Sequence, residues 1–227
     1  ARIERQIEQR TMMLSGVSHD LRTPITRLKL EVELLPQDND SAAMLRDLSE
    51  MEHMLDEFLA FAKGDHAENA ALSQSWHIAS KCVEDAMRAQ PQAEISLSPA
   101  QHPADWSDVL IKPMGFSRAL GNLISNAVSF SSVVEVSVSQ STEDLTFRVE
   151  DNGPGIPPGQ RETALKAFTR LDVARNQDRV GGVGLGLAIA ADVARVHGGK
   201  LELTESSRFG GLCATITVPM RAANDTT

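Results

Sequence analysis

The segment LTFRVEDNGPGI, residues 145–156, decides the fold class. Its first apolar residues alternate with polar ones, which predicts a strand with one buried face. Asp151 falls on that face, and a buried carboxylate needs a hydrogen-bond donor, such as the exocyclic amine of a nucleotide base. Gly153 and Gly155 in the following turn permit positive φ angles and close approach to a ligand. The alternative is an ordinary turn that ends a strand.

Four other short runs alternate in the same way, and helical patterns lie between them. We therefore expect an α/β sandwich, with one mixed sheet and helices packed on one of its faces. The predicted strands are residues 94–98, 133–139, 145–151, 200–204 and 213–218, and the predicted helices are residues 76–90, 114–130, 158–168 and 184–197.

The predicted helix over residues 114–130 carries polar residues on one face. Arg118, Asn122, Asn126 and Ser129 are four, four and three residues apart, so they lie on the same side of the helix. Asparagine is a middling helix former, but its amide oxygen suits a hard cation such as Mg²⁺. This face is therefore either a ligand site or an ordinary solvated surface.

A glycine-rich segment, VGGVGLGLAIA, begins at residue 180 and runs directly into an apolar helix. Gly182, Gly184 and Gly186 leave backbone amides open at the helix start, where phosphate groups bind. The preceding residues 169–180 are irregular and rich in arginine, including Arg170. They predict a mobile flap over a polyphosphate and do not resemble the strand that leads into a dinucleotide-binding fold.

Residues 1–63 are predicted to be helical, with a break over residues 36–40 and Ser41 as the next N-cap. Two helices alone bury little surface, so we expect an antiparallel hairpin that dimerises into a four-helix bundle. The alternative is a two-helix arm lying on the second domain. A small, polar linker follows over residues 64–75. The heptad seam of the first helix comprises Ile7, Thr11, Leu14, Ser18, Leu21, Ile25, Leu28, Val32 and Leu35.

The segment SGVSHDLRTP, residues 15–24, places a histidine beside this seam. His19 lies on the flank of the apolar stripe and should be accessible to solvent. Asp20 can accept a hydrogen bond from one ring nitrogen, which leaves the other nucleophilic. Pro24 bends or weakens the helix one turn later, which an ordinary surface His–Asp pair would not explain.

Composition limits the possible functions. The chain has 227 residues, 41% hydrophobic residues and a net charge of −9, which argues against a nucleic-acid partner. Its two cysteines have no metal-binding spacing, so free thiols are expected. No stretch reaches the roughly 18–20 apolar residues of a membrane helix. Because the sequence starts at Ala, we expect a soluble fragment of a longer protein.

Together these motifs, in this order, resemble the core of a sensor histidine kinase. SHDLRTPITRL resembles the phosphoacceptor H-box, NLISNA the N-box and DNGPGI the G1 box. LKAFTRLD is similar to a weakened F-box, and GGVGLGLAIA is similar to the G2 box. Within the family, the region around the H-box resembles most the EnvZ-like osmosensor kinases of bacteria.

The resemblance implies a role for each matching residue. His19 would be the phosphorylated histidine, with Asp20 raising its nucleophilicity and Thr23 orienting water when the partner is dephosphorylated. Asn126 would hold Mg²⁺ with Asn122 near the same phosphates. The other implied residues of the nucleotide site are Asp151, which would bind the adenine amine, and Gly153, Gly155, Arg170, Gly182, Gly184, Leu185 and Gly186.

The implied fold is a dimerisation and phosphotransfer hairpin, residues 1–67, followed by an ATP-binding α/β sandwich, residues 68–227. This sandwich is of the Bergerat type shared by histidine kinases, gyrase and Hsp90. The implied activity is ATP-dependent phosphorylation of His19 and transfer to an aspartate of a response regulator receiver domain, with response-regulator phosphatase activity as well. The resemblance also implies that the chain is a homodimer and that it is the cytoplasmic part of a bacterial inner-membrane protein.

Some residues depart from the family pattern. The family often has Lys or Arg where Ser129 stands, and the lost phosphate contact is worth about 1.5–3 kcal/mol unless Arg118 or Arg170 replaces it. Lys166 and Ala167 stand where Phe and Pro are usual. These departures support one alternative, a non-catalytic signalling scaffold with a degenerate nucleotide domain. A second alternative is an ATP-hydrolysing conformational machine built on the same sandwich, although such a machine needs no helix bearing His19.

Overall fold

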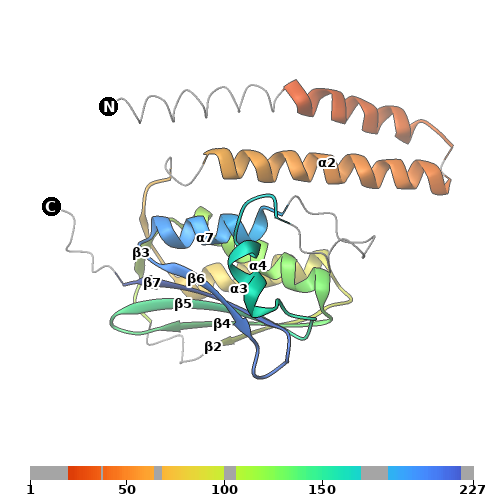
Figure 1. The fold of residues 1–227 in the computed structure, drawn as a ribbon. Coiled ribbons are helices and arrows are strands. Elements are labelled where there is room, and N and C mark those ends of the chain that lie inside the picture. Colours follow the sequence, from red (N-terminus) through yellow and green to blue (C-terminus); the bar gives the residue numbers. More distant parts are fainter. Residues whose placement is uncertain (1–19, 37, 64–67, 100–105, 170–183, 221–227) are drawn as a thin grey trace.

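The computed structural model describes residues 20–36, 38–63, 68–99, 106–169 and 184–220. Within these residues the chain forms a pair of long helices followed by an α/β sandwich (Figure 1). The predicted fold class is confirmed, and each of the two regions follows from a different sequence pattern.

The first region is an antiparallel helical hairpin. A helix over residues 20–33 lies alongside α2 (Asn39–Lys63), and the chain reverses between them (Figure 1). Lys29 Nζ and Glu52 Oε2 are 2.6 Å apart and connect the two helices across the pair. The first helix continues through Pro24 without a break.

The start of α2 differs from the prediction in its cap. Asp38, and not Ser41, occupies the N-cap position: its Oδ1 accepts hydrogen bonds from the N–H groups of Asp40 at 3.0 Å and Ser41 at 2.8 Å. The hydroxyl of Ser41 in turn accepts from the Asp38 N–H at 2.9 Å. The two residues form a reciprocal capping box, in which Ser41 is the third helical residue. Asp and Ser are both favoured at the N-cap, so residue type alone does not decide between these two positions.

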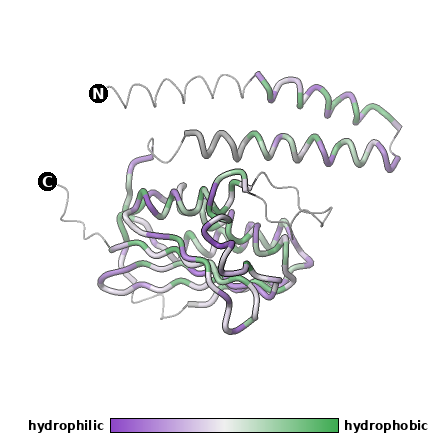
Figure 2. The backbone as a smooth tube through the Cα atoms, viewed as in Figure 1, coloured by the Kyte–Doolittle hydropathy of each residue, from purple (hydrophilic) through white to green (hydrophobic). Residues whose placement is uncertain are grey.

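The heptad seam of the first helix is only half buried within the chain. Among the described seam residues, Ile25 and Val32 are buried, whereas Leu21, Leu28 and Leu35 are close to half exposed. Figure 2 shows hydrophobic and hydrophilic residues alternating along the hairpin. One set of exposed apolar residues recurs every seven positions: Leu21 and Leu28 on the first helix, Leu35 just after it, and Met44 and Met51 on α2. Leu30 and Leu34 are exposed as well but lie outside this repeat.

The second region contains one mixed sheet with the strand order β2-β4-β5-β7-β6. β2 and β4 are parallel, and the other neighbouring strands are antiparallel. The helices α3 (Ser75–Ala89), α4 (Pro113–Phe130) and α7 (Gly186–Val196) cover one face (Figure 1). The strands are β2 (Glu94–Pro99), β4 (Val133–Gln140), β5 (Asp144–Asp151), β6 (Lys200–Glu205) and β7 (Leu212–Pro219).

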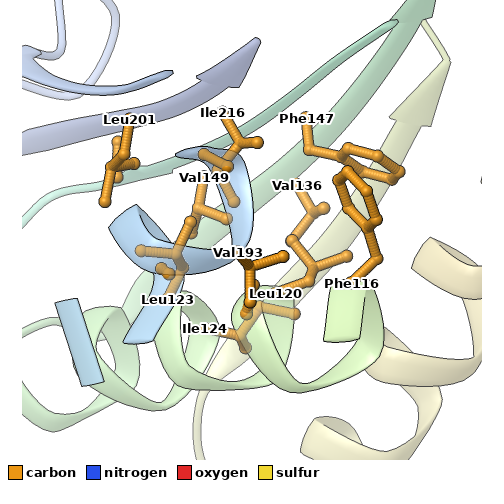
Figure 3. Packing of buried hydrophobic residues seen from close by; sticks show 14 of the residues in the cluster. Phe116, Leu120, Leu123, Ile124, Val136, Phe147, Val149, Val193, Leu201 and Ile216 are labelled. Atoms are coloured by element: carbon orange, nitrogen blue, oxygen red, sulfur yellow. The ribbon is translucent and has the colours of Figure 1, made fainter. Parts of the chain in front are cut away.

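The core lies between this sheet and α4 and α7. Figure 3 shows side chains of both helices pointing toward those of the strands. The rings of Phe116 on α4 and Phe147 on β5 are 5.3 Å apart between centroids and are each 1% exposed. The strands bury every second residue, as their alternating sequences predict. The other labelled core residues are Leu120, Leu123, Ile124, Val136, Val149, Val193, Leu201 and Ile216.

Two features were not predicted. β1 (Ala71–Ser73) and β3 (Val109–Ile111) form a second, two-stranded antiparallel sheet, so part of the expected linker is a strand. The predicted helix over residues 158–168 is reduced to a 3₁₀ turn, Pro158–Gln160, and α5 (Arg161–Ala164). α5 ends at Ala164, and four residues later Phe168 adopts a left-handed φ of 62° and donates its N–H to Gly184 O, a conformation that a continued helix does not allow.

Candidate functional site

The carboxylate of Asp151 lies at the end of β5, on the buried side of the sheet, as predicted. The residue is 4% exposed, and its Oδ1 accepts hydrogen bonds from Gly153 N–H at 2.8 Å and Leu212 N–H at 3.1 Å. Burial raises the pKa of the carboxyl, although these two N–H groups act in the opposite direction. Among the described residues, Oδ2 accepts no hydrogen bond. A buried acceptor is therefore available to a donor from a ligand.

The turn after Asp151 is held close to the end of α4. A Cβ on Gly153 would lie 2.9 Å from the Phe130 carbonyl oxygen, and Gly155 has a φ of 67°. Asn152 Oδ1 accepts from the N–H groups of Ser132 and Val133, both at 3.1 Å, and so connects the turn to the start of β4. Both glycines are thus required by the backbone path.

Sequence reasoning missed the residues on the other side of Asp151. A Cβ on Gly211 would lie 2.4 Å from Asp151 Oδ1, so β7 can approach the carboxylate only through a glycine. Leu212, the next residue, donates its N–H to the same oxygen. The pair of glycines immediately before the last predicted strand, Gly210 and Gly211, was the available signal.

The two asparagines lie on α4, between the Asp151 turn and the start of α7. Nδ2 of Asn122 is buried and donates no hydrogen bond within the described residues. A Cβ on Gly186 would lie 3.5 Å from Asn122 Cβ, so the first turn of α7 packs directly against this asparagine. Asn126 is half-buried one turn later on the same helix. The site extends along α4 from Asn122 to Phe130, which is about 12 Å.

Phe168 and Thr169 contact Gly184 at the edge of the site. Phe168 N–H donates to Gly184 O at 3.0 Å, and a Cβ on Gly184 would lie 2.6 Å from Thr169 O. Gly184 has a φ of 75°, and Leu185 after it is completely buried. Residues 169 and 184 are therefore neighbours at this edge of the site.

The departures from the family pattern have structural consequences. Ser129 is exposed, and its hydroxyl donates to Ser125 O at 2.8 Å, so it serves its own helix. Ala167 packs partly against the core, whereas Phe168 is 55% exposed.

The remaining predicted residues divide between the hairpin and the parts of the chain that are not described. Asp20 and Thr23 are exposed in the first helix of the hairpin. His19, Arg170 and Gly182 lie outside the described residues.

The described side chains fit a nucleoside triphosphate. Asp151 offers a buried acceptor for a base amine, and the unsatisfied Nδ2 of Asn122 offers a donor for phosphate oxygen. The described residues contain no cluster of three or more His, Cys, Asp or Glu side chains for a metal ion. A Mg²⁺ ion held by one amide oxygen and the phosphates of the nucleotide does not require such a cluster.

Fold and site thus define a helical hairpin joined to a nucleotide-binding α/β sandwich. Residues 111–222 match the family of histidine kinase-, DNA gyrase B- and HSP90-like ATPases, and residues 9–67 match the His Kinase A (phospho-acceptor) domain. The chain belongs to the sensor histidine kinases and contains an ATP-binding kinase domain. The prediction of a sensor histidine kinase core close to the EnvZ-like kinases is thereby confirmed.

Individual relatives agree with this assignment. The chain is 33% identical over 218 residues to the sensor histidine kinase GtrS of Pseudomonas aeruginosa, covering 96% of this chain and 44% of the relative. It is 30% identical over 228 residues to the sensor histidine kinase CpxA of Escherichia coli, covering 96% and 49%. The ATP binding domain of PrrB from Mycobacterium tuberculosis superposes with a TM-score of 0.55 at 26% identity, covering 68% of this chain and all of that domain.

The chain spans about half the length of these curated relatives. In the described part of the chain, no helix has both the length and the apolar character needed to cross a membrane.

Proposed function

We propose that this chain is the kinase core of a two-component sensor protein, with a phosphoacceptor hairpin over residues 1–67 and an ATP-binding domain over residues 68–227. The γ-phosphoryl group of ATP passes to a ring nitrogen of His19: the nitrogen–phosphorus bond forms as the bond to the ADP oxygen breaks. The phosphoryl group then moves to an aspartate of a response regulator receiver domain. The observation that carries this proposal is the pairing of two groups at opposite ends of one site, the buried Asp151 acceptor and the unsatisfied amide of Asn122 on α4.

In this proposal the sandwich binds and orients the nucleotide. Asp151 accepts a hydrogen bond from the adenine amine, in a pocket shaped by Gly153 and Gly155. Asn122 donates to the phosphates, and Asn126 holds Mg²⁺, which supplies charge neutralisation during phosphoryl transfer.

We infer that the glycine-rich segment forms a lid over the same phosphates. The backbone amides of Leu185 and Gly186 lie at the start of α7, where an anion is favoured. We assign this role to Gly182, Gly184, Leu185 and Gly186, with Arg170 supplying a positive charge.

The hairpin provides the acceptor and the dimer contact. Asp20 accepts a proton or hydrogen bond from one ring nitrogen of His19, and Thr23, one turn later, orients water when the regulator is dephosphorylated. A homodimer is supported by the exposed apolar residues that recur every seven positions, which include Leu21 and Leu28. A second copy of the hairpin would cover both stripes and complete a four-helix bundle.

We also propose that this core lies on the cytoplasmic side of a bacterial inner membrane as part of a longer protein. The relatives GtrS and CpxA, of which the chain covers 44% and 49%, support a longer parent. ATP as the phosphoryl donor supports the cytoplasmic side.

The test is incubation of the chain with γ-labelled ATP and Mg²⁺. We expect an acid-labile, base-stable phosphoprotein that His19→Gln abolishes. His77→Gln is the matched control, because His77 is an exposed histidine on α3 of the sandwich and should keep the label. Label retained in His19→Gln would contradict the assignment.

A non-catalytic scaffold is the second candidate. The exposed Ser129, whose hydroxyl is held by its own helix, favours it because this position supplies no cation to the phosphates. Calorimetry with ATP in the presence and absence of Mg²⁺ separates the two: a scaffold with a degenerate site shows no Mg²⁺-dependent binding, and the kinase does.

A further inference from the structure

The helix that carries both asparagines has no cap of its own. α4 begins at Pro113, and Lys112 in the N-cap position makes no side-chain capping bond. The first turn of α4 contains no acidic residue. Because the first amides of a helix have no partner within the helix and carry partial positive charge, this start needs an acceptor from elsewhere.

Glu68 supplies that acceptor from the linker after the hairpin. Its Oε1 accepts the Met114 N–H at 2.7 Å, and its Oε2 accepts the Gly115 N–H at 2.9 Å. The contact is bidentate and charge-assisted, which fixes its direction as well as its strength. Pro113 has no N–H, so Glu68 satisfies the first two amides that α4 presents.

The backbone on either side of this contact is also fixed to the start of α4. Lys112 N–H donates to His197 Nε2 at 3.0 Å, at the far end of α7. Three residues after Glu68 the chain enters β1, which pairs with β3, and β3 leads directly into Lys112 and α4. Glu68 and the start of α4 therefore belong to one rigid unit.

The same unit lies very close to the end of the hairpin in the sequence. α2 ends at Lys63, so only residues 64–67 separate it from Glu68. Without the Glu68 contact, the segment between α2 and the next fixed element, β1, would extend over residues 64–70. A longer connection lowers the effective concentration of one domain near the other and widens the range of their orientations.

We propose that Glu68 is a positioning residue, which fixes the end of the hairpin to the start of the nucleotide-binding helix α4. It thereby sets how the nucleotide held by Asn122 and Asn126 is presented to the hairpin. This inference rests on the proposed phosphoryl transfer to His19. Glu68 touches neither the nucleotide nor the histidine and acts through the position of α4.

The test measures three quantities on the full chain: the rate of labelling at saturating ATP, the ATP dissociation constant, and unfolding followed by tryptophan fluorescence. In Glu68→Ala we expect labelling to slow by about two- to threefold, from a connection lengthened from four to seven residues, while ATP affinity stays unchanged. Glu68→Gln keeps one acceptor oxygen and should give an intermediate rate. Glu143→Ala removes an exposed carboxylate from the β4–β5 turn and is the matched control.

The outcomes are distinguishable. Unchanged labelling in Glu68→Ala overturns the inference. So does a loss of ATP affinity equal to the loss of rate, because Glu68 would then only stabilise the nucleotide site. If the Glu68→Ala chain does not fold, Glu68→Gln is measured in its place, and a wild-type labelling rate in Glu68→Gln overturns the inference. If the wild-type chain itself takes no label, the proposed function fails, and this inference fails with it.

Discussion

The sandwich and the hairpin bury their apolar residues in different ways. In the sandwich, Phe116, Phe147 and Ile216 are at most 1% exposed, and two helices and a sheet share one core. In the hairpin, Leu28 is 44% exposed, and only alternate members of the seam are buried. Two layers enclose a core, whereas one helix pair covers only one stripe of each helix. The sandwich can therefore be stable alone, whereas the proposed dimer would cover the exposed stripe of the hairpin.

The two regions also differ in how they use a carboxylate. Asp38 caps α2 at the surface, and its hydrogen bond from the Ser41 amide lowers its pKa. Asp151 is buried at the end of β5, and burial raises its pKa. The first carboxylate stabilises the fold as an anion. Burial makes the ionised form of the second carboxylate less favourable, at a position where a ligand can bind it. Such a shifted pKa is typical of a functional site.

The largest expected effect is on the sandwich core. Phe147→Ala removes a fully buried ring that packs on Phe116 and should lower the free energy of unfolding by about 3–5 kcal/mol. Urea unfolding followed by the fluorescence of Trp76 and Trp106, both in the sandwich, measures it. Phe209→Ala, at a half-buried surface ring, is the control. Equal losses in the two variants would contradict a core centred on Phe147.

The next effect concerns the hairpin alone. Leu28→Asp places a charge in the exposed stripe and should weaken dimerisation at least about a hundredfold, because each copy loses a leucine worth about 1.5–3 kcal/mol. Sedimentation velocity measures the dimer, and the fluorescence unfolding of the sandwich should not change. Leu30→Asp, on an exposed leucine off the seam, should leave the dimer intact. If both variants stay dimeric, the stripe is not the interface.

A third change separates binding from stability within the sandwich. Asp151→Asn keeps the Oδ1 acceptor for Gly153 and Leu212 but removes the charge, so ATP affinity should fall about tenfold or more. Because the buried charge is unfavourable, the unfolding free energy should stay the same or rise. Calorimetry and urea unfolding give the two values. Asp144→Asn, at the exposed start of the same strand, should change neither.

The smallest effect is the pH dependence of the hairpin cap. Because the pKa of Asp38 is lowered in the folded chain, its stabilising contribution is complete above its unfolded value of 3.8 and is lost as pH falls through the lowered value. Asp38→Asn should remove this part of the acid sensitivity, as followed by helical circular dichroism. Asp40→Asn, in the same turn, should retain it. An identical acid profile for wild type and Asp38→Asn would contradict the cap.

Much of the fold was predictable because its patterns are local. Period-two alternation identified every strand of the main sheet, and the heptad seam identified the hairpin. β1 and β3 were missed because each has three residues, too few to show a period. The early end of the helix near Phe168 depends on Gly184, which is distant in sequence.

The site was predictable to the same degree. The positions of Asp151 and Asn122 follow from strand and helix periods. The contributions of Gly211, Leu212 and Glu68 do not, because each depends on a contact with a residue more than 40 positions away in the sequence.

The central claim is a division of roles: the sandwich binds the nucleotide, and the hairpin accepts its phosphoryl group. The most direct measurement compares bound ATP and incorporated label in wild type, His19→Gln and Asp151→Asn. We predict that His19→Gln binds ATP as the wild type does and takes no label, whereas in Asp151→Asn bound ATP and label fall together at an ATP concentration near the wild-type Kd. Label that persists in His19→Gln, or full labelling in Asp151→Asn, would contradict the account.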